Sequence, residues 1–156
     1  MVRTRVYIDG FNLYYGAVRR TPYRWLNVAR MCEHLLPGRE IVGYKYFTAL
    51  VKPRPSDLDK RRRQRVFMRA LKTIPTLEVI LGHFLTHEKR LPLSSSPVES
   101  PRYVTAWVTE EKGSDVNLAT HLLNDAHLDR FEDAVIVSND SDLLLPIQVV
   151  MEQYGR

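Results

Sequence analysis

Four aspartates occupy positions at which a folded chain could concentrate negative charge. Asp9 ends the apolar segment RVYID, and Asp140 and Asp142 follow the apolar segment DAVIVS with one serine between them. Asp115 comes directly after EEKGS, in the first turn of a predicted helix, where free N–H groups and the helix dipole favour a carboxylate. Two neighbouring carboxylates need either solvent or a cation, so these residues are the first candidates for a site.

The geometry of a parallel sheet decides whether these aspartates meet. Ligands bind at the carboxyl ends of parallel strands, where the connection order reverses. If the strands that end at Asp9 and Ser138 are neighbours, Asp9 and Asp140 face each other across one crevice. An all-carboxylate site suits Mg²⁺ or Mn²⁺, and such an ion activates water for attack on a phosphodiester. Each aspartate also has a structural alternative, as a helix-start residue for Asp115 and Asp142 or as a turn residue for Asp9.

The elements that would position the aspartates alternate between strands and helices, which is typical of an α/β domain with a mainly parallel sheet. Strands are predicted at residues 5–9, 40–50, 77–85 and 133–138. Helices are predicted at residues 27–36, from a cap at Ser56 or Asp57 to about Ile74, at 114–127 and at 142–154. The helix over 114–127 is expected to turn inward Val116, Ala119, Leu122, Leu123 and Ala126.

Between residues 86 and 109 the α/β alternation breaks. A segment rich in Ser, Pro and charge is followed by RYVTAWVTEE, which alternates like an exposed strand. We therefore expect an antiparallel hairpin or flap over this region, with its tip around residues 94–100. The length of 156 residues otherwise favours a single domain over residues 1–156.

Composition narrows the class of protein. With 44% hydrophobic and 26% charged residues the chain resembles a soluble globular domain, and no apolar run is long enough to cross a bilayer. A strand begins within a few residues of Met1 and leaves no room for a signal peptide, so we expect a cytoplasmic protein. Cys32 is the single cysteine and excludes an internal disulfide, while the histidines lack zinc-site spacing. The net charge of +5 favours a polyanionic partner.

Three blocks in order, YIDGFNLYY (7–15), EEKGSDVNLATHLL (110–123) and VIVSNDSDLLLPI (135–147), resemble the NYN domain of the PIN-like nuclease superfamily. The likeness is greatest to its bacterial branch of DUF88 or LabA type and covers nearly the whole chain. It implies a PIN-like three-layer α/β sandwich, with a mainly parallel central sheet and the antiparallel hairpin as an excursion. It also implies an acidic pocket that binds Mg²⁺ or Mn²⁺, and ribonuclease activity by a metal-activated water.

Site residues follow from the resemblance motif by motif. The metal ligands it implies are Asp9, Asp115, Asp140 and Asp142, and the same four residues together with Asn12 form its catalytic set. Asn12 would contact the metal's water shell or the phosphate, or else cap a helix starting near Leu13. His121 stands where many members carry a further Asp, and its role stays open between a phosphate contact and a partly exposed helix histidine. Family members usually continue past this C-terminus into one more strand, so a truncated chain is consistent with the ending QYGR.

Basic side chains and one tyrosine are the candidate RNA contacts. They are Lys52, Arg54, Arg61, Arg62, Arg65, Lys112 and Tyr14. Basic groups neutralise phosphates, and an aromatic ring near the crevice stacks on an unpaired base. The alternatives are a solvated helix face for the arginines of segment 59–73, core packing for the tyrosine and a plain surface position for Lys112. Trp107 either packs the flap or touches the substrate.

The sequence thus predicts a Mg²⁺- or Mn²⁺-dependent endoribonuclease that acts on single-stranded RNA or on loops of structured RNA. A catalytically silent RNA-binding or protein-interaction module that retains the acidic pocket is the alternative. A phosphatase with an aspartyl nucleophile is disfavoured, because Gly10 and Phe11 stand where it needs a DxD motif. RNA is the expected partner and a membrane is not, while a homodimer, the RNA substrate and the biological role stay open.

Overall fold

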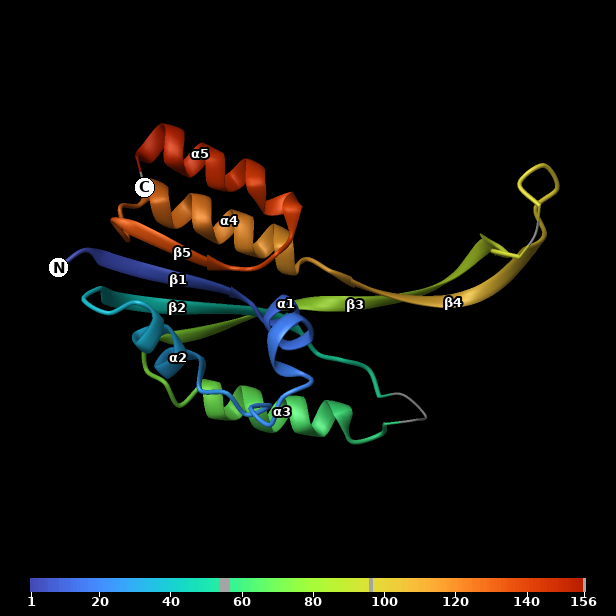
Figure 1. The fold of residues 1–156 in the computed structure, drawn as a ribbon, viewed down its shortest axis with the longest axis horizontal. Coiled ribbons are helices and arrows are strands. Elements are labelled where there is room, and N and C mark those ends of the chain that lie inside the picture. Colours follow the sequence, from blue (N-terminus) through green and yellow to red (C-terminus); the bar gives the residue numbers. More distant parts are fainter. Residues whose placement is uncertain (54–56, 96, 156) are drawn as a thin grey trace.

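The protein is described by a computed structural model that covers residues 1–53, 57–95 and 97–155. Its centre is a sheet of five strands in the order β4-β3-β2-β1-β5 (Figure 1). Four neighbouring strands are parallel, and β4 pairs antiparallel with β3 at one edge. The strands are β1 (Arg3–Asp9), β2 (Glu40–Ala49), β3 (Leu77–Pro92), β4 (Tyr103–Lys112) and β5 (Asp133–Val137).

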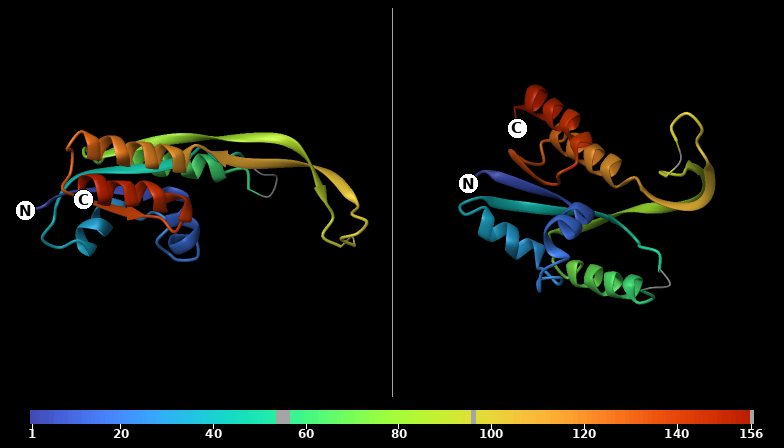
Figure 2. Two further views of the ribbon diagram at one scale, coloured as in Figure 1. Left: turned by 90° about the horizontal axis from the view of Figure 1, so that it is seen from above. Right: turned by 45° about the vertical axis from the view of Figure 1, so that its right-hand side comes forward.

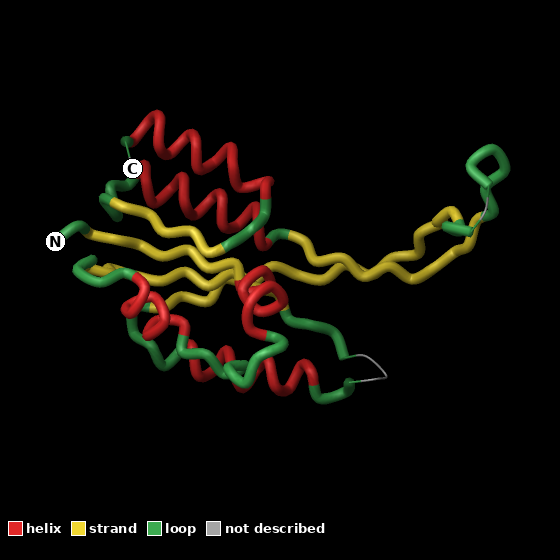
Figure 3. Tube along the Cα trace, viewed as in Figure 1, coloured by secondary structure: helices red, strands yellow, loops and turns green. Residues whose placement is uncertain are grey.

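Helices cover both faces of this sheet and give three layers (Figures 1 and 3). One face carries α4 (Ser114–His127) and α5 (Leu144–Tyr154), the latter preceded by the 3-10 turn η2 (Ser141–Leu143). The other face carries α1 (Gly10–Leu13), the π-helical turn η1 (Tyr14–Val18), α2 (Val28–Leu35) and α3 (Lys60–Leu71). The predicted three-layer α/β sandwich with a mainly parallel sheet is confirmed. No helix in the described ranges has the length and apolar character to cross a bilayer.

Two apolar clusters, one on each face of the sheet, hold the layers together. Because side chains alternate along a strand, β1 sends Val6 and Ile8 toward α2 and α3 and Tyr7 toward α4 and α5. All three are fully buried, as expected for a strand at the centre of the sheet. Cys32, the single cysteine, is buried in the first cluster with a free thiol.

Two helices differ from the prediction. α3 begins at Lys60 with Asp59 at the N-cap position, and Asp57 instead accepts a hydrogen bond from Arg63 at 2.5 Å, so a cap at Asp57 was wrong. Ser56 lies outside the described residues. In α4 the predicted inward position of Val116 was also wrong, because Val116 is 69% exposed while Leu118 is 1% exposed. The buried stripe of α4 includes a charged residue, Asp125, and this displaced the apparent apolar face.

The predicted hairpin excursion is confirmed and is longer than expected. Residues 77–82 of β3 pair with β2, and residues 83–92 pair with residues 103–112 of β4. This two-stranded ribbon, here called the arm, leaves the carboxyl edge of the sheet and projects away from the body (Figures 1 and 2). Gly82 lies at the point of departure, where an added Cβ would be 2.7 Å from the carbonyl oxygen of Lys112. A residue without a side chain is therefore required for β3 and β4 to approach so closely.

Candidate active site

The connection order of the sheet reverses between β1 and β5. The chain passes from β1 outward through β2 and β3, whereas β5 lies on the other side of β1. Ile8 pairs with Val137, so both strands end at the same level and Asp9 lies beside the segment that follows β5. The two strands that precede Asp9 and Asp140 are therefore neighbours at a switch point, which is where open α/β sheets bind ligands.

A pocket of about 740 Å³ opens at this edge and is here called the acidic pocket. Its lining includes Asp9 from the end of β1, Asp115 from the first turn of α4 and Asp140 from the segment after β5. Glu111 of β4 lines the same hollow and was not expected from the sequence. Asp142 is exposed and is not among the lining residues.

Asp9 is 3% exposed and forms the N-cap of α1. Its Oδ1 accepts hydrogen bonds from the backbone N–H groups of Phe11 and Asn12, both at 3.0 Å. Its Oδ2 accepts from the Asn12 side-chain amide and, at 3.1 Å, from the Ser138 hydroxyl. A carboxylate has about four lone-pair sites, so these bonds use the whole acceptor capacity of Asp9. The alternative in which Asn12 caps a helix from Leu13 was wrong, because α1 begins at Gly10.

Ser138 links the two strand ends. Its hydroxyl donates to Asp9 and accepts the backbone N–H of Asp140 at 3.1 Å. Asp140 caps η2, since its Oδ1 accepts the backbone N–H of Asp142 at 2.9 Å. The close pair of aspartates is thus tolerated because only Asp140 faces the pocket, while Asp142 remains in solvent.

The carboxylates of the acidic pocket act on one another electrostatically. The pKa of Asp115 is raised to about 6, first by burial and then by the negative charges of Asp9, Asp140, Glu111 and Asp142. Glu111 accepts from the backbone N–H and the hydroxyl of Ser114, at 3.2 and 2.9 Å, and so fixes the start of α4. The pocket therefore accumulates negative charge from three separate segments of the chain.

The donor chemistry of the pocket fits a hard divalent cation, which prefers oxygen ligands. Within the described residues, however, no group of three or more His, Cys, Asp or Glu side chains is arranged to hold a metal ion. At Asp9, the side chains of Asn12 and Ser138 already donate hydrogen bonds to the carboxylate. Ion binding at this residue requires one of those two side chains to withdraw.

The residues predicted to contact RNA lie in different parts of the structure. Lys52 lines the acidic pocket, where its ammonium group donates to Thr86 of the arm. Tyr14 lines a neighbouring pocket instead. Lys112 lies outside both linings and forms an ion pair with Glu110 at 3.0 Å. Arg54 lies outside the described residues.

The arginines predicted on α3, namely Arg61, Arg62 and Arg65, line neither pocket. The face of α3 that does so carries Lys60, Arg63, Gln64 and Phe67. Their spacing of three, four and seven residues is that of one helical face, and this was the signal that could have identified them. Trp107, whose role was open, is 71% exposed on the arm and lines the acidic pocket.

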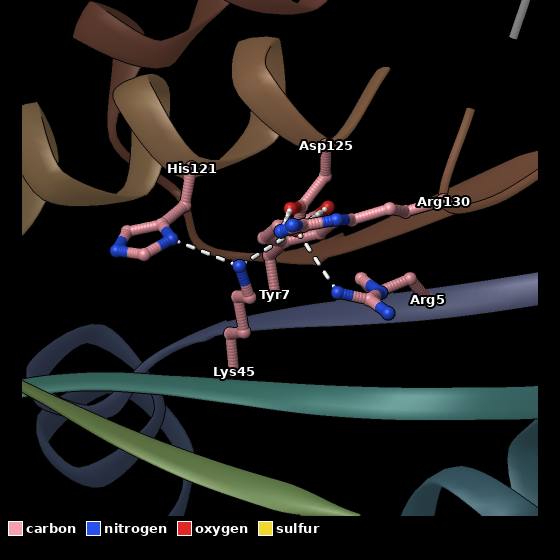
Figure 4. A network of polar contacts seen from close by, with 6 residues as sticks. All are labelled: Arg5, Tyr7, Lys45, His121, Asp125 and Arg130. Carbon is pink, nitrogen blue, oxygen red and sulfur yellow. Dashed lines mark hydrogen bonds and ion pairs between the residues drawn. The ribbon is translucent and has the colours of Figure 1, made fainter. Parts of the chain in front are cut away.

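A buried polar network that the sequence did not reveal anchors α4 to the sheet (Figure 4). Asp125 is fully buried and accepts from Lys45 of β2 at 2.7 Å and from the Tyr7 hydroxyl at 2.9 Å. Arg5 and Arg130 complete the network, with nitrogens 3.2 and 2.9 Å from the same carboxylate. The network fixes the helix whose first turn presents Asp115.

His121 belongs to this network and lines neither pocket. Its Nδ1 lies 2.8 Å from the ammonium nitrogen of Lys45. Lysine carries no acceptor, so Nδ1 accepts and the imidazole is neutral. Burial and the nearby charge of Lys45 lower the pKa of His121, in agreement with this assignment. His121 is therefore a packing and hydrogen-bonding residue of α4 that contacts Lys45 and Phe47 of β2.

The layered fold, the strand order and the acidic edge define an α/β protein of the PIN-like type. The family model of the NYN domain matches residues 3–156, and the chain therefore belongs to the NYN domain family. This is a nuclease-type family.

Two individual proteins are similar to the chain. The 6-hydroxy-3-succinoylpyridine 3-monooxygenase HspA of Pseudomonas putida (strain DSM 28022 / S16) is 33% identical over an alignment of 173 positions, which spans 96% of this chain and 55% of that protein. The chain thus spans about half the length of this curated relative. A protein of unknown function from Vibrio parahaemolyticus shares the fold with a TM-score of 0.60 at 18% identity, over 99% of this chain and 77% of the other.

Proposed function

We propose that this chain is a Mg²⁺- or Mn²⁺-dependent endoribonuclease that hydrolyses phosphodiester bonds of single-stranded or looped RNA at the acidic pocket. The observation that carries the proposal is that Asp9, Asp115 and Asp140, which are distant in sequence, line one hollow at the switch point of the sheet. The raised pKa of Asp115 supports it, because perturbed carboxylates in a cleft are typical of functional sites.

Asp9, Asp115 and Asp140 would hold the ion. Asp142, which lies outside the pocket, would add its negative charge to the electrostatic attraction for the ion. When bound, the divalent cation supplies an activated water and stabilises negative charge on the phosphate. The Asn12 side-chain amide donates to Asp9, and it would be free to donate to a phosphate oxygen if Asp9 held the ion. Lys52 and Lys60, which also line the pocket, are placed to hold the substrate's phosphates.

The arm favours an unpaired substrate. Trp107 exposes its ring at the acidic pocket, beside Thr86 and Thr109 of the same ribbon. An exposed indole stacks on a base that is not already stacked in a duplex, which is how single-strand binders gain affinity without sequence preference. The direct consequence is a preference for single strands and loops over double-stranded RNA.

Cleavage of labelled single-stranded RNA by the purified protein tests the proposal. We expect cleavage with Mg²⁺ or Mn²⁺, none with EDTA, and a loss of at least about 100-fold in Asp140→Asn, as is usual when a catalytic group is removed. Glu152→Gln is the matched control, because Glu152 is an exposed carboxylate of α5 outside both pocket linings. Cleavage that survives both EDTA and Asp140→Asn would contradict the proposal, and RNA binding without any cleavage would favour the silent module.

The relative's name gives a second candidate, an enzyme that acts on a hydroxypyridine with a carboxylate side chain. The 33% identity over nearly the whole chain favours it, as does a second pocket lined by aromatic rings and arginines. Thermal melting with and without 6-hydroxy-3-succinoylpyridine separates the candidates. A dose-dependent rise in melting temperature with this compound, and none with RNA, would favour the second.

A further inference from the structure

A second pocket, of about 900 Å³, lies against the acidic pocket and is here called the basic pocket. It is formed by α1 and η1, by the segment that leads to α2, and by one face of α3. The two pockets share Phe11, Tyr15, Val51 and Lys60 in their linings. Its volume is in the upper part of the range of about 300–1,000 Å³ found for ligand sites. A ligand can therefore extend from one pocket into the other past Tyr15 and Lys60.

The two pockets differ in charge. The basic side chains that line the second pocket are Arg19, Arg20, Arg24, Lys60 and Arg63. Asp57 is the acidic residue of this lining, and it is already paired with Arg63 at 2.5 Å. Arg19, Arg20 and Arg24 are exposed, and within the described residues none of the three forms an ion pair with a carboxylate. These arginines are available to an anionic ligand.

Aromatic rings lie among these cations. Trp25 is 56% exposed, and its ring centroid is 6.3 Å from that of Phe67 on α3. Tyr15 is 46% exposed, with the guanidinium carbon of Arg19 at 5.5 Å and the ammonium nitrogen of Lys60 at 5.8 Å from its ring centroid. Exposed rings beside unpaired guanidinium groups provide a stacking surface for bases and charges for phosphates, the combination used to bind single strands.

We propose that the basic pocket binds the nucleotides next to the cleaved phosphodiester bond, so that an RNA strand runs from the acidic pocket over Tyr15 and Lys60 to Trp25. This inference rests on the proposed function for the identity of the strand, but binding at the basic pocket does not require cleavage. Arg19 and Arg24 neutralise its phosphates, and Trp25 stacks on a base. The arginines of the opposite face of α3 take no part.

Fluorescence anisotropy with a labelled single-stranded RNA in EDTA tests the pocket, because neither ion binding nor cleavage contributes under this condition. Arg19→Ala with Arg24→Ala should weaken binding about tenfold or more and lower the slope of log affinity against log salt by about 1.4, which is about 0.7 for each phosphate contact on a single strand. The matched control is Arg62→Ala with Arg65→Ala, which removes the same charge from exposed positions outside both pockets and should change affinity less than about threefold. Trp25→Ala should cost about fivefold or more, and Trp25→Phe should restore most of the loss.

Equal losses in the two double variants would overturn the inference, because affinity would then follow net charge alone. Unchanged affinity in Arg19→Ala with Arg24→Ala would overturn it too, as would binding of 6-hydroxy-3-succinoylpyridine at this pocket in a protein that binds no RNA. Failure of the proposed function gives a different result: cleavage is absent, while the basic-pocket variants still lose RNA affinity relative to the control. Asp140→Asn should bind RNA in EDTA at least as tightly as the unmodified protein.

Discussion

The pKa of Asp115 shows the effect of the electrostatics of the acidic pocket most clearly. Its pKa is raised to about 6 by burial and by four neighbouring carboxylates, so the folded protein holds this proton more tightly than the unfolded chain. The contribution of protonated Asp115 to the stability of the fold is complete below about pH 4, which is near the ordinary pKa of aspartate. It is lost as the pH rises through about 6. Above that pH the charged Asp115 destabilises the fold, and a bound divalent cation would remove the repulsion.

Replacing Asp115 by Asn tests this electrostatic account. In EDTA at pH 8 the variant should melt about 2 °C or more above the unmodified protein, because one of the repelling charges is gone. At pH 4 the two folded proteins should melt nearly alike, since Asp115 of the unmodified protein is then protonated and, like the asparagine of the variant, carries no charge. The rise in melting temperature that Mn²⁺ produces at pH 8 should shrink in the variant. Identical melting curves at pH 8, with and without Mn²⁺, would show that Asp115 does not experience the proposed repulsion.

At the scale of the element, α4 connects the acidic pocket to the buried network. Its first turn presents Asp115, and one face further along buries Asp125 against β1 and β2. Burial alone would raise the pKa of Asp125, but hydrogen bonds from Lys45, Tyr7 and Arg130 outweigh it and lower the pKa below the ordinary value. The stabilisation is therefore present above about pH 4 and is lost as pH falls through the lowered pKa.

Asp125→Asn should lower the free energy of unfolding at pH 7 by about 3–5 kcal/mol, because Lys45 is left as a buried charge without its carboxylate partner. The loss of stability below pH 4 should be smaller in the variant than in the unmodified protein. Urea denaturation across pH 2–8 measures both effects. Glu33→Gln is the control, because it breaks an exposed pair with Arg30 and should cost less than about 1 kcal/mol. Similar costs for the two variants would contradict the role given to the network.

Gly82 controls how the base of the arm meets α4. An alanine there would place its Cβ 2.5 Å from the Glu111 carboxylate and 2.7 Å from the Lys112 carbonyl oxygen, so the backbone has to move. Gly82→Ala should cost about 1–3 kcal/mol of stability and should weaken Mn²⁺ binding, because Glu111 and the start of α4 shift. Gly16→Ala is the matched control, with no atom within 4 Å of the added Cβ. Chemical denaturation and Mn²⁺ titration check the pair, and equal behaviour would refute the proposed constraint.

Strand periodicity and the general rules of parallel sheets predicted the elements and the edge at which the aspartates lie, whereas the burial of a charged residue and the pairing of distant segments were not predicted. Strand periodicity and the rule that parallel strands share their carboxyl edge were enough to bring Asp9 and Asp140 together. The inward face of α4 was mispredicted at Val116, because the buried stripe contains the charged Asp125. The length of β3 was missed because its two halves pair with different strands. The basic pocket is lined by residues of α1, of the segment that leads to α2, and of α3. These segments are separate in the sequence, so no local pattern predicts that they meet.

At the scale of the whole molecule, the proposed binding surfaces follow one edge of the sheet. The arm, the acidic pocket and the basic pocket are contiguous there, since Trp107 and Asp115 line the acidic pocket and Tyr15 lines both pockets. The net charge of +5 is compatible with a polyanion that follows this edge while the carboxylates hold a cation. Under the proposed function, the ion, the phosphates and the bases would therefore lie on successive parts of one surface.

A crystal of the protein soaked in Mn²⁺ would show whether these carboxylates share a divalent cation. We expect anomalous density among the carboxyl groups of Asp9, Asp115 and Asp140, with the Asn12 amide or the Ser138 hydroxyl withdrawn from Asp9. Soaked crystals in which Asp9 keeps all its present hydrogen bonds, and in which saturating Mn²⁺ gives no density in the acidic pocket, would contradict this expectation.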